Sequence, residues 1–146
     1  MNHETFMQRC LELARRAGVS GDTWVGSLIV FKGQIIEEGI ERVKASHDLT
    51  AHAEIEAVKE ACTKLASNNL EGCILYTTAE PCFMCSQIIR QTRISQVVFG
   101  RRVPDTGGVT SKFPILTDAS YDKLAPPPMV VAGVLADECE LLLRKI

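Results

Sequence analysis

The order of strand-like and helix-like segments is the feature that most constrains how this chain can fold. Short apolar runs bounded by turn residues predict five strands, at residues 25–31, 34–40, 73–78, 94–100 and 129–135. Apolar residues at helical spacing predict four helices, at residues 4–17, 51–66, 81–92 and 136–146. Strands that alternate with helices form a sheet with helices on both faces. The sequence therefore predicts an α/β fold, a three-layer α/β/α sandwich around a mixed five-stranded sheet.

Turn residues and polar segments place the connections between these elements. Lys32-Gly33 indicates a hairpin between the first two strands, and Pro81 suits the first turn of a helix. Residues 41–50 are polar and predict a loop, and residues 101–128 are rich in turn residues. Residues 116–124 within that second loop have no clear pattern. The sequence leaves open whether residues 101–128 form a lid over a pocket.

Length and composition predict one globular domain over residues 1–146. Hydrophobic residues make up 46% of the chain and charged residues 23%, close to the globular average. The net charge of -2 disfavours a broad phosphate-binding surface of the kind that coats duplex DNA. No apolar run approaches the ~20 residues of a membrane span, and the first 18 residues lack the apolar core of a signal peptide. We therefore expect a cytoplasmic protein without a membrane partner.

The six cysteines are expected to be reduced, because the chain can build a core without disulfides and shows no secretion signal. Four of them have apolar spacing and predict small core residues: Cys10, Cys62, Cys73 and Cys139. Cys82 and Cys85 are the only close pair, and they lie where a helix is expected to begin. A helix N-terminus favours thiolates, which are the metal-binding form of cysteine.

His52 and these two cysteines form a candidate set of three zinc ligands. A catalytic zinc site leaves its fourth position to water, whereas a structural site is closed by four protein ligands. Glu54 follows His52 by two residues and could act as a general acid and base near the metal. His47 as a fourth ligand would instead make the site structural. A redox role for Cys82 and Cys85 alone would leave His52 and Glu54 unexplained.

The spacing H-x-E followed by P-C-x-x-C is the signature of zinc deaminases. On these residues the sequence resembles the cytidine and deoxycytidylate deaminase superfamily, which comprises zinc-dependent nucleobase and nucleoside deaminases. Segments 97–100 and 133–139 are most similar to the branch of guanine deaminases and tRNA adenosine deaminases. The resemblance extends from about residue 5 to residue 145.

This resemblance implies a cytidine deaminase-like fold and one Zn²⁺ per chain, held by His52, Cys82 and Cys85. It implies that Glu54 carries protons during a hydrolytic reaction that releases ammonia. The backbone N–H groups of Ala53 and Cys82 would help to hold the water and the substrate. The family also implies a homodimer.

Two positions depart from the family pattern. Glu41 occupies the position, counted back from His52, of the family's substrate-contacting Asn. An ionised Glu only accepts hydrogen bonds, so it would favour a ring that offers N–H groups, unless Glu41 is a surface loop charge. Trp24 stands where the tRNA branch usually has Pro, and it either stacks on a flat substrate ring or packs in the core.

These features rank three functions. The first is hydrolytic deamination of an amino-substituted nucleobase or nucleoside, a small amino-heterocycle that resembles guanine. The alternative is deamination of adenosine to inosine in tRNA, which the net charge and the absence of an aromatic, basic tail before Ile146 disfavour. The third is a non-catalytic subunit that keeps zinc for stability, which the presence of Glu54 disfavours.

Overall fold

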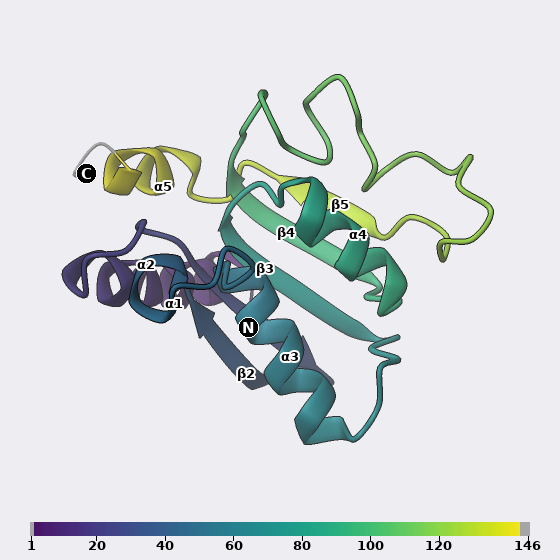
Figure 1. The fold of residues 1–146 in the computed structure, drawn as a ribbon, viewed down its shortest axis with the longest axis horizontal. Helices are drawn as coiled ribbons and strands as arrows, with labels where there is room; N and C mark the ends of the chain where they lie inside the picture. Colours follow the sequence, from purple (N-terminus) through teal and green to yellow (C-terminus); the bar gives the residue numbers. More distant parts are fainter. Residues whose placement is uncertain (1, 144–146) are drawn as a thin grey trace.

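A single five-stranded sheet forms the centre of the computed structural model, which describes residues 2–143 (Figure 1). Its strands are β1 (Gly26–Phe31), β2 (Gln34–Ile40), β3 (Cys73–Ala79), β4 (Gln96–Arg101) and β5 (Met129–Ala132). Their order is β2-β1-β3-β4-β5; β1 is antiparallel to β2 and β3, and β4 is parallel to β3 and β5. The prediction of a mixed five-stranded sheet is confirmed.

Helices cover both faces of this sheet and complete the predicted three layers (Figure 1). Helices α1 (His3–Val19) and α5 (Ala136–Leu143) contact each other on one face. Helices α3 (Ala53–Leu65) and α4 (Phe83–Gln91) contact each other on the other face. Asn2 begins α1, because its side chain accepts a hydrogen bond from the N–H of Thr5. In the described chain, no helix combines the length and the apolar character that a membrane span needs.

Alternation along the strands divides the core into two clusters. Leu28 and Val30 of β1 pack with the face of α1 and α5, whereas Ile29 between them packs with the face of α3 and α4. Tyr76 and Leu75 of β3 divide in the same way. Successive strand side chains point to opposite faces, so continuously apolar strands fill a core on each side of the sheet.

The structure corrects several predicted boundaries. Residues 41–50 are not entirely a loop, because they contain the short helix α2 (Val43–Ser46). Pro81 precedes the N-cap residue Cys82 and so lies before α4 rather than in its first turn. Strand β5 ends at Ala132, because Gly133 has a positive φ of 85°. The predicted end of the last helix, residues 144–146, lies outside the described residues.

Arg90 organises the long connection between β4 and β5, which contains no helix or strand between residues 102 and 128 (Figure 1). Its guanidinium is buried and donates two hydrogen bonds to the carbonyl of Ala125 and one each to those of Ile115 and Asp118. Backbone carbonyls that a strand or helix would satisfy internally are satisfied here by one side chain. This explains how a segment with no sequence periodicity is held in place.

Candidate active site

The three candidate zinc ligands meet where two helices of the same face begin. His52 is the N-cap residue of α3, and Cys82 is the N-cap residue of α4. Cys85 lies in the first turn of α4, and both cysteines follow the end of β3. Helix N-termini carry partial positive charge, which favours thiolates at these positions. Neither N-cap side chain forms a capping hydrogen bond, so both remain available to a ligand.

The distances between these ligand atoms fit tetrahedral zinc. His52 Nδ1 lies 3.6 Å from Cys82 Sγ and 3.5 Å from Cys85 Sγ. Zn–N and Zn–S bonds at a tetrahedral angle require about 3.6 Å between nitrogen and sulfur. Within residues 2–143, these three form the one group of at least three metal-ligating side chains with mutually close atoms. Three protein ligands leave one position open, which is the arrangement of a catalytic site.

Protonation at this site follows from the contacts among the ligands. A hydrogen bond from Cys85, together with one from His52, lowers the pKa of Cys82 to about 4. The hydrogen bond with Cys82 raises the pKa of His52 to about 9. Cys82 is therefore a thiolate at neutral pH, and a bound zinc ion would displace the proton of His52.

Glu54 lies in the first turn of α3 and is almost fully buried. Its Oε1 accepts hydrogen bonds from Thr77 Oγ1 at 2.8 Å and from Ser27 Oγ at 3.3 Å. Burial raises the pKa of Glu54, which brings its carboxyl group closer to the range useful for proton transfer at neutral pH. The two hydroxyls come from neighbouring strands, so the sheet orients this carboxylate.

Glu41 follows β2 and is buried rather than a surface loop charge. Its Oε1 accepts a hydrogen bond from the N–H of Ala53 at 3.0 Å and so supplies the capping bond that His52 does not. Burial and the nearby charge of Glu54 raise the pKa of Glu41 to about 7. The N–H of Ala53, which was expected to hold the water or the substrate, therefore already has a partner within the chain.

A cavity of about 130 Å³ opens at this group of residues. It is lined by Val25, Glu41, His52, Glu54, Ala79, Glu80, Cys82, Val103 and Thr106. The parallel strands β3 and β4 both end beside it, which is where ligands bind in open α/β sheets. Val103 and Thr106 show that the beginning of the 101–128 loop forms part of the wall.

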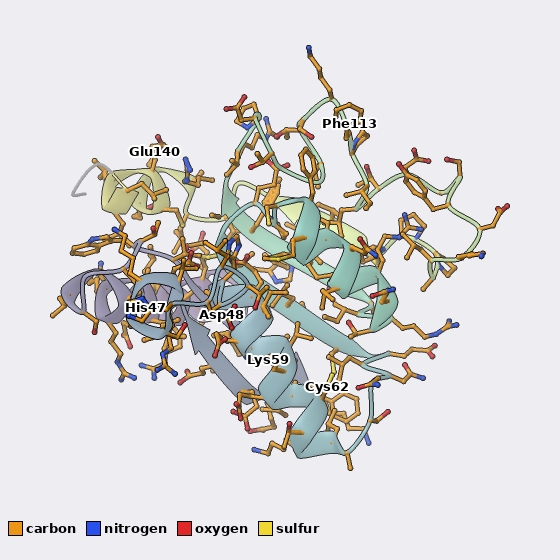
Figure 2. The ribbon with its side chains drawn as sticks, in the orientation of Figure 1. His47, Asp48, Lys59, Cys62, Phe113 and Glu140 are labelled. Atoms are coloured by element: carbon orange, nitrogen blue, oxygen red, sulfur yellow. The ribbon has the colours of Figure 1, made fainter. Side chains whose placement is uncertain are left out.

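Trp24 and His47 are not brought to this cavity. The Trp24 ring packs on the core beneath α1 and α5 and against Gly18, where an added Cβ would come within 1.9 Å of it. Its position corresponds to the core alternative rather than to stacking on a substrate. His47 ends α2 with an exposed side chain and is not in the ligand group (Figure 2). The structure thus assembles three ligands and not four.

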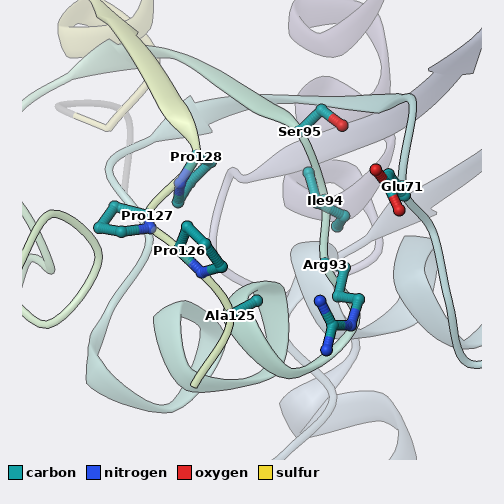
Figure 3. Close-up of a pocket in the computed structure, with 8 residues that line it drawn as sticks. All are labelled: Glu71, Arg93, Ile94, Ser95, Ala125, Pro126, Pro127 and Pro128. Carbon is teal, nitrogen blue, oxygen red and sulfur yellow. The ribbon is translucent and has the colours of Figure 1, made fainter. Parts of the chain in front are cut away.

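A second cavity lies far from this chemistry. It has a volume of about 230 Å³ and lies between the turn that precedes β4 and the proline run 126–128 (Figure 3). Glu71 and Arg93 are its only charged lining residues, and it contains none of the three zinc ligands. The functional groups therefore converge on the smaller cavity.

Sequence reasoning missed several polar residues that support the site. Ser27 and Thr77 interrupt otherwise apolar strands, and this was the available signal for a buried polar contact. Asp22 is buried and accepts hydrogen bonds from two N–H groups at the start of α2, those of Lys44 and Ala45. Glu80 is buried as well, and no local pattern distinguishes it from a surface residue.

Known proteins share these features over most of the chain. A tRNA-specific adenosine deaminase from Aquifex aeolicus is 44% identical over 122 residues, which cover 84% of this chain and 81% of that protein. A guanine deaminase from Bacillus subtilis is 44% identical over 108 residues, covering 72% and 68%. A solved structure from studies of A-to-I editing by tRNA:A34 deaminases superimposes with a TM-score of 0.89 and 32% identity, covering 95% of this chain and 99% of that one.

The zinc ligands also lie within a matching family model. Residues 1–101 match the cytidine and deoxycytidylate deaminase zinc-binding region. This range includes His52, Cys82 and Cys85, whose geometry fits zinc. The protein is a zinc-dependent deaminase, and the chain belongs to the cytidine and deoxycytidylate deaminase zinc-binding family.

Proposed function

We propose that this deaminase removes the exocyclic amine of a purine ring and that its substrate is an adenosine held in tRNA. The observation that carries this proposal is the likeness, over nearly the whole fold, to the tRNA:A34 deaminase structure. The identity to the tRNA-specific adenosine deaminase also extends over more of the chain than the identity to the guanine deaminase. The comparisons thus favour the substrate that charge and Glu41 had placed second.

The size of the cavity is compatible with this substrate. Its 130 Å³ is below the ~300–1,000 Å³ of pockets that enclose a drug-sized ligand. A single base that has been turned out of a nucleic-acid loop presents only its ring to the enzyme, while the backbone stays outside. Arg102, next to Val103 of the cavity wall, is exposed and forms no ion pair with any residue between 2 and 143. It supplies a positive charge for a phosphate near the entrance.

We assign the proton transfers to Glu54. Zinc held by His52, Cys82 and Cys85 would lower the pKa of a water at its open position toward ~7. Glu54, oriented through Oε1 by Thr77 and Ser27, would take a proton from that water as the new C–O bond forms. It would then give the proton to the amine as the C–N bond breaks, so that ammonia leaves.

A free aminopurine such as guanine is the second candidate, and Glu41 is the observation that favours it. The carboxylate lines the cavity, and only its Oε1 has a hydrogen-bond partner among the described residues. An ionised carboxylate accepts hydrogen bonds from ring N–H groups, which guanine offers and the adenine ring nitrogens do not. Glu41→Gln separates the two substrates, because the amide both donates and accepts.

The test is release of ammonia from zinc-loaded protein with guanine, adenosine, and a tRNA that carries adenosine at the wobble position. The same tRNA with guanosine there is the matched control. Turnover of the adenosine tRNA alone, retained in Glu41→Gln, supports the first proposal. Turnover of guanine, reduced at least ~10-fold in Glu41→Gln, supports the second. Glu54→Gln should lower either activity by at least ~100-fold with zinc retained. No turnover of any of these would contradict both and favour a non-catalytic subunit.

We also propose that the protein acts as a homodimer, as expected from its family. Phe83 directly follows the ligand Cys82, and its ring lies edge-on to that of Phe113 at 6.1 Å between centroids. Both rings are partly exposed, Phe113 on the long loop (Figure 2). Sedimentation velocity of the zinc-loaded protein should give a dimer, and Phe83→Ser with Phe113→Ser should shift it toward monomer. A monomeric wild type would contradict this assembly.

A further inference from the structure

Glu80 is a buried carboxylate that no cation neutralises. It follows the last residue of β3, precedes Cys82 by two residues and is 3% exposed. In the described part of the chain, it forms no ion pair with Lys, Arg or His. A buried charge of this kind is costly unless hydrogen bonds satisfy it. The question is therefore what its hydrogen bonds hold.

All its hydrogen-bond donors come from one loop. Oε1 accepts from the N–H of Val103 at 2.8 Å and from Thr110 Oγ1 at 2.6 Å. Oε2 accepts from the N–H groups of Val109 at 2.8 Å and Thr110 at 2.7 Å. Burial raises the pKa of Glu80, but these hydrogen bonds outweigh it and hold the pKa below the ordinary value. One ionised side chain thus joins both ends of residues 103–110.

The backbone on either side of Glu80 reinforces this connection. Pro81 O accepts a hydrogen bond from the N–H of Gly108 at 2.8 Å, and Cys82 forms a β-bridge with Gly107. A Cβ added at Gly107 would lie 2.0 Å from Glu80 Oε2, so only glycine fits against the carboxylate. The 103–110 loop is therefore packed directly on the segment that carries a zinc ligand.

The same loop forms part of the cavity. Val103 donates to Glu80 and lines the cavity, and Thr106 lines it from the middle of the loop. We propose that Glu80 is a positioning residue that fixes residues 103–110 as a wall of the substrate cavity. The proposal rests on the deaminase activity of the site and is independent of which purine is the substrate. It assigns Glu80 a role in substrate binding rather than in the chemical step.

Glu80→Gln tests this role with little change in shape. The amide keeps one acceptor oxygen and turns an NH₂ group toward N–H donors, so two of the four bonds are lost. Hydrogen bonds to a charged group change an equilibrium by about tenfold or more each. We expect KM to rise at least ~10-fold, kcat to change less than ~3-fold and one zinc per chain to be retained. Glu60→Gln, at an exposed position of α3, is the matched control.

Hydrogen exchange reads the loop without any substrate. In Glu80→Gln, the amides of Val103, Val109 and Thr110 should exchange at least ~10-fold faster, while those of β1 keep their protection. This measurement stays decisive if the purine assignment fails, because neither exchange nor zinc content depends on the substrate. Unchanged exchange in the loop would overturn the proposal, as would faster exchange with an unchanged KM.

Thr110 provides a second variant in case Glu80→Gln does not fold. Thr110→Val removes only the hydroxyl donor to Oε1, and Thr110→Ser restores it. KM should rise about threefold to tenfold in Thr110→Val and return to the wild-type value in Thr110→Ser. An equal KM for the valine and serine variants would contradict a role of the hydroxyl in positioning the wall.

Discussion

Replacing Arg90 by methionine should be among the most destabilising single substitutions in this protein. The Arg90 side chain is 1% exposed, and its guanidinium makes four hydrogen bonds of 2.5–3.1 Å to three backbone carbonyls. Methionine fills similar space with no donor. The carbonyls of Ile115, Asp118 and Ala125 would then lose their partner.

The magnitude follows from the number and kind of these bonds. A hydrogen bond from a charged donor contributes about 1.5–3 kcal/mol. The sum of four overestimates the loss, because burying the guanidinium itself is costly and because the 113–125 loop can open to water. We therefore expect the free energy of unfolding to fall by about 3–5 kcal/mol, a size reached only when a buried network is broken.

Urea unfolding of the zinc-loaded protein measures this loss. With a slope of about 2 kcal/mol per M, the midpoint should fall by about 1.5–2.5 M. Arg90→Lys keeps the charge but not the planar group of donors, and should recover less than half of the difference. Arg15→Met, at an exposed position of α1, is the matched control and should shift the midpoint little. A loss below about 1 kcal/mol for Arg90→Met would show that the loop does not depend on this side chain.

Three further perturbations test other parts of the structure. Hydrogen bonds from Arg9 hold the pKa of Glu38 below its ordinary 4.5. The stability that Arg9→Met loses should thus be present above about pH 4.5 and vanish as pH falls through the lower, folded-state pKa, as urea midpoints at pH 7 and 3.5 would show. Chelation of zinc should lower the melting temperature, and added zinc should restore it. Gly18→Ala places a Cβ 1.9 Å from the Trp24 ring, so it should cost about 1–3 kcal/mol by urea unfolding, and less when Trp24→Ala makes room.

Residues close in sequence were the predictable part of the site. His52 and Glu54 are two residues apart, and Cys82 and Cys85 are three apart, so each pair has a local spacing that indicates metal chemistry. Glu80 had no such spacing, because its donors lie 23–30 residues further along the chain. Glu41 was singled out, yet its hydrogen bond to the N–H of Ala53 could be seen only once β2 and α3 were packed together.

The sequence by itself determined the elements, their order and the chemistry of the zinc ligands. Periodicity of apolar residues and the positions of Gly and Pro act over a few residues, and they specified the helices and strands to within a few positions. The short helix α2 escaped because its N–H groups are satisfied by Asp22, on the far side of the β1–β2 hairpin. Its stability comes from a tertiary contact and not from its own four residues.

Only the tertiary structure decided how the cavity is built. It oriented Glu54 through Ser27 and Thr77 on two strands, and it fixed the 103–110 loop on Glu80. Buried polar groups must find partners wherever the fold supplies them, and those partners lie far apart in the sequence. The reaction class is therefore legible in local spacing, whereas the walls that select a substrate arise from contacts that exist only in the folded chain.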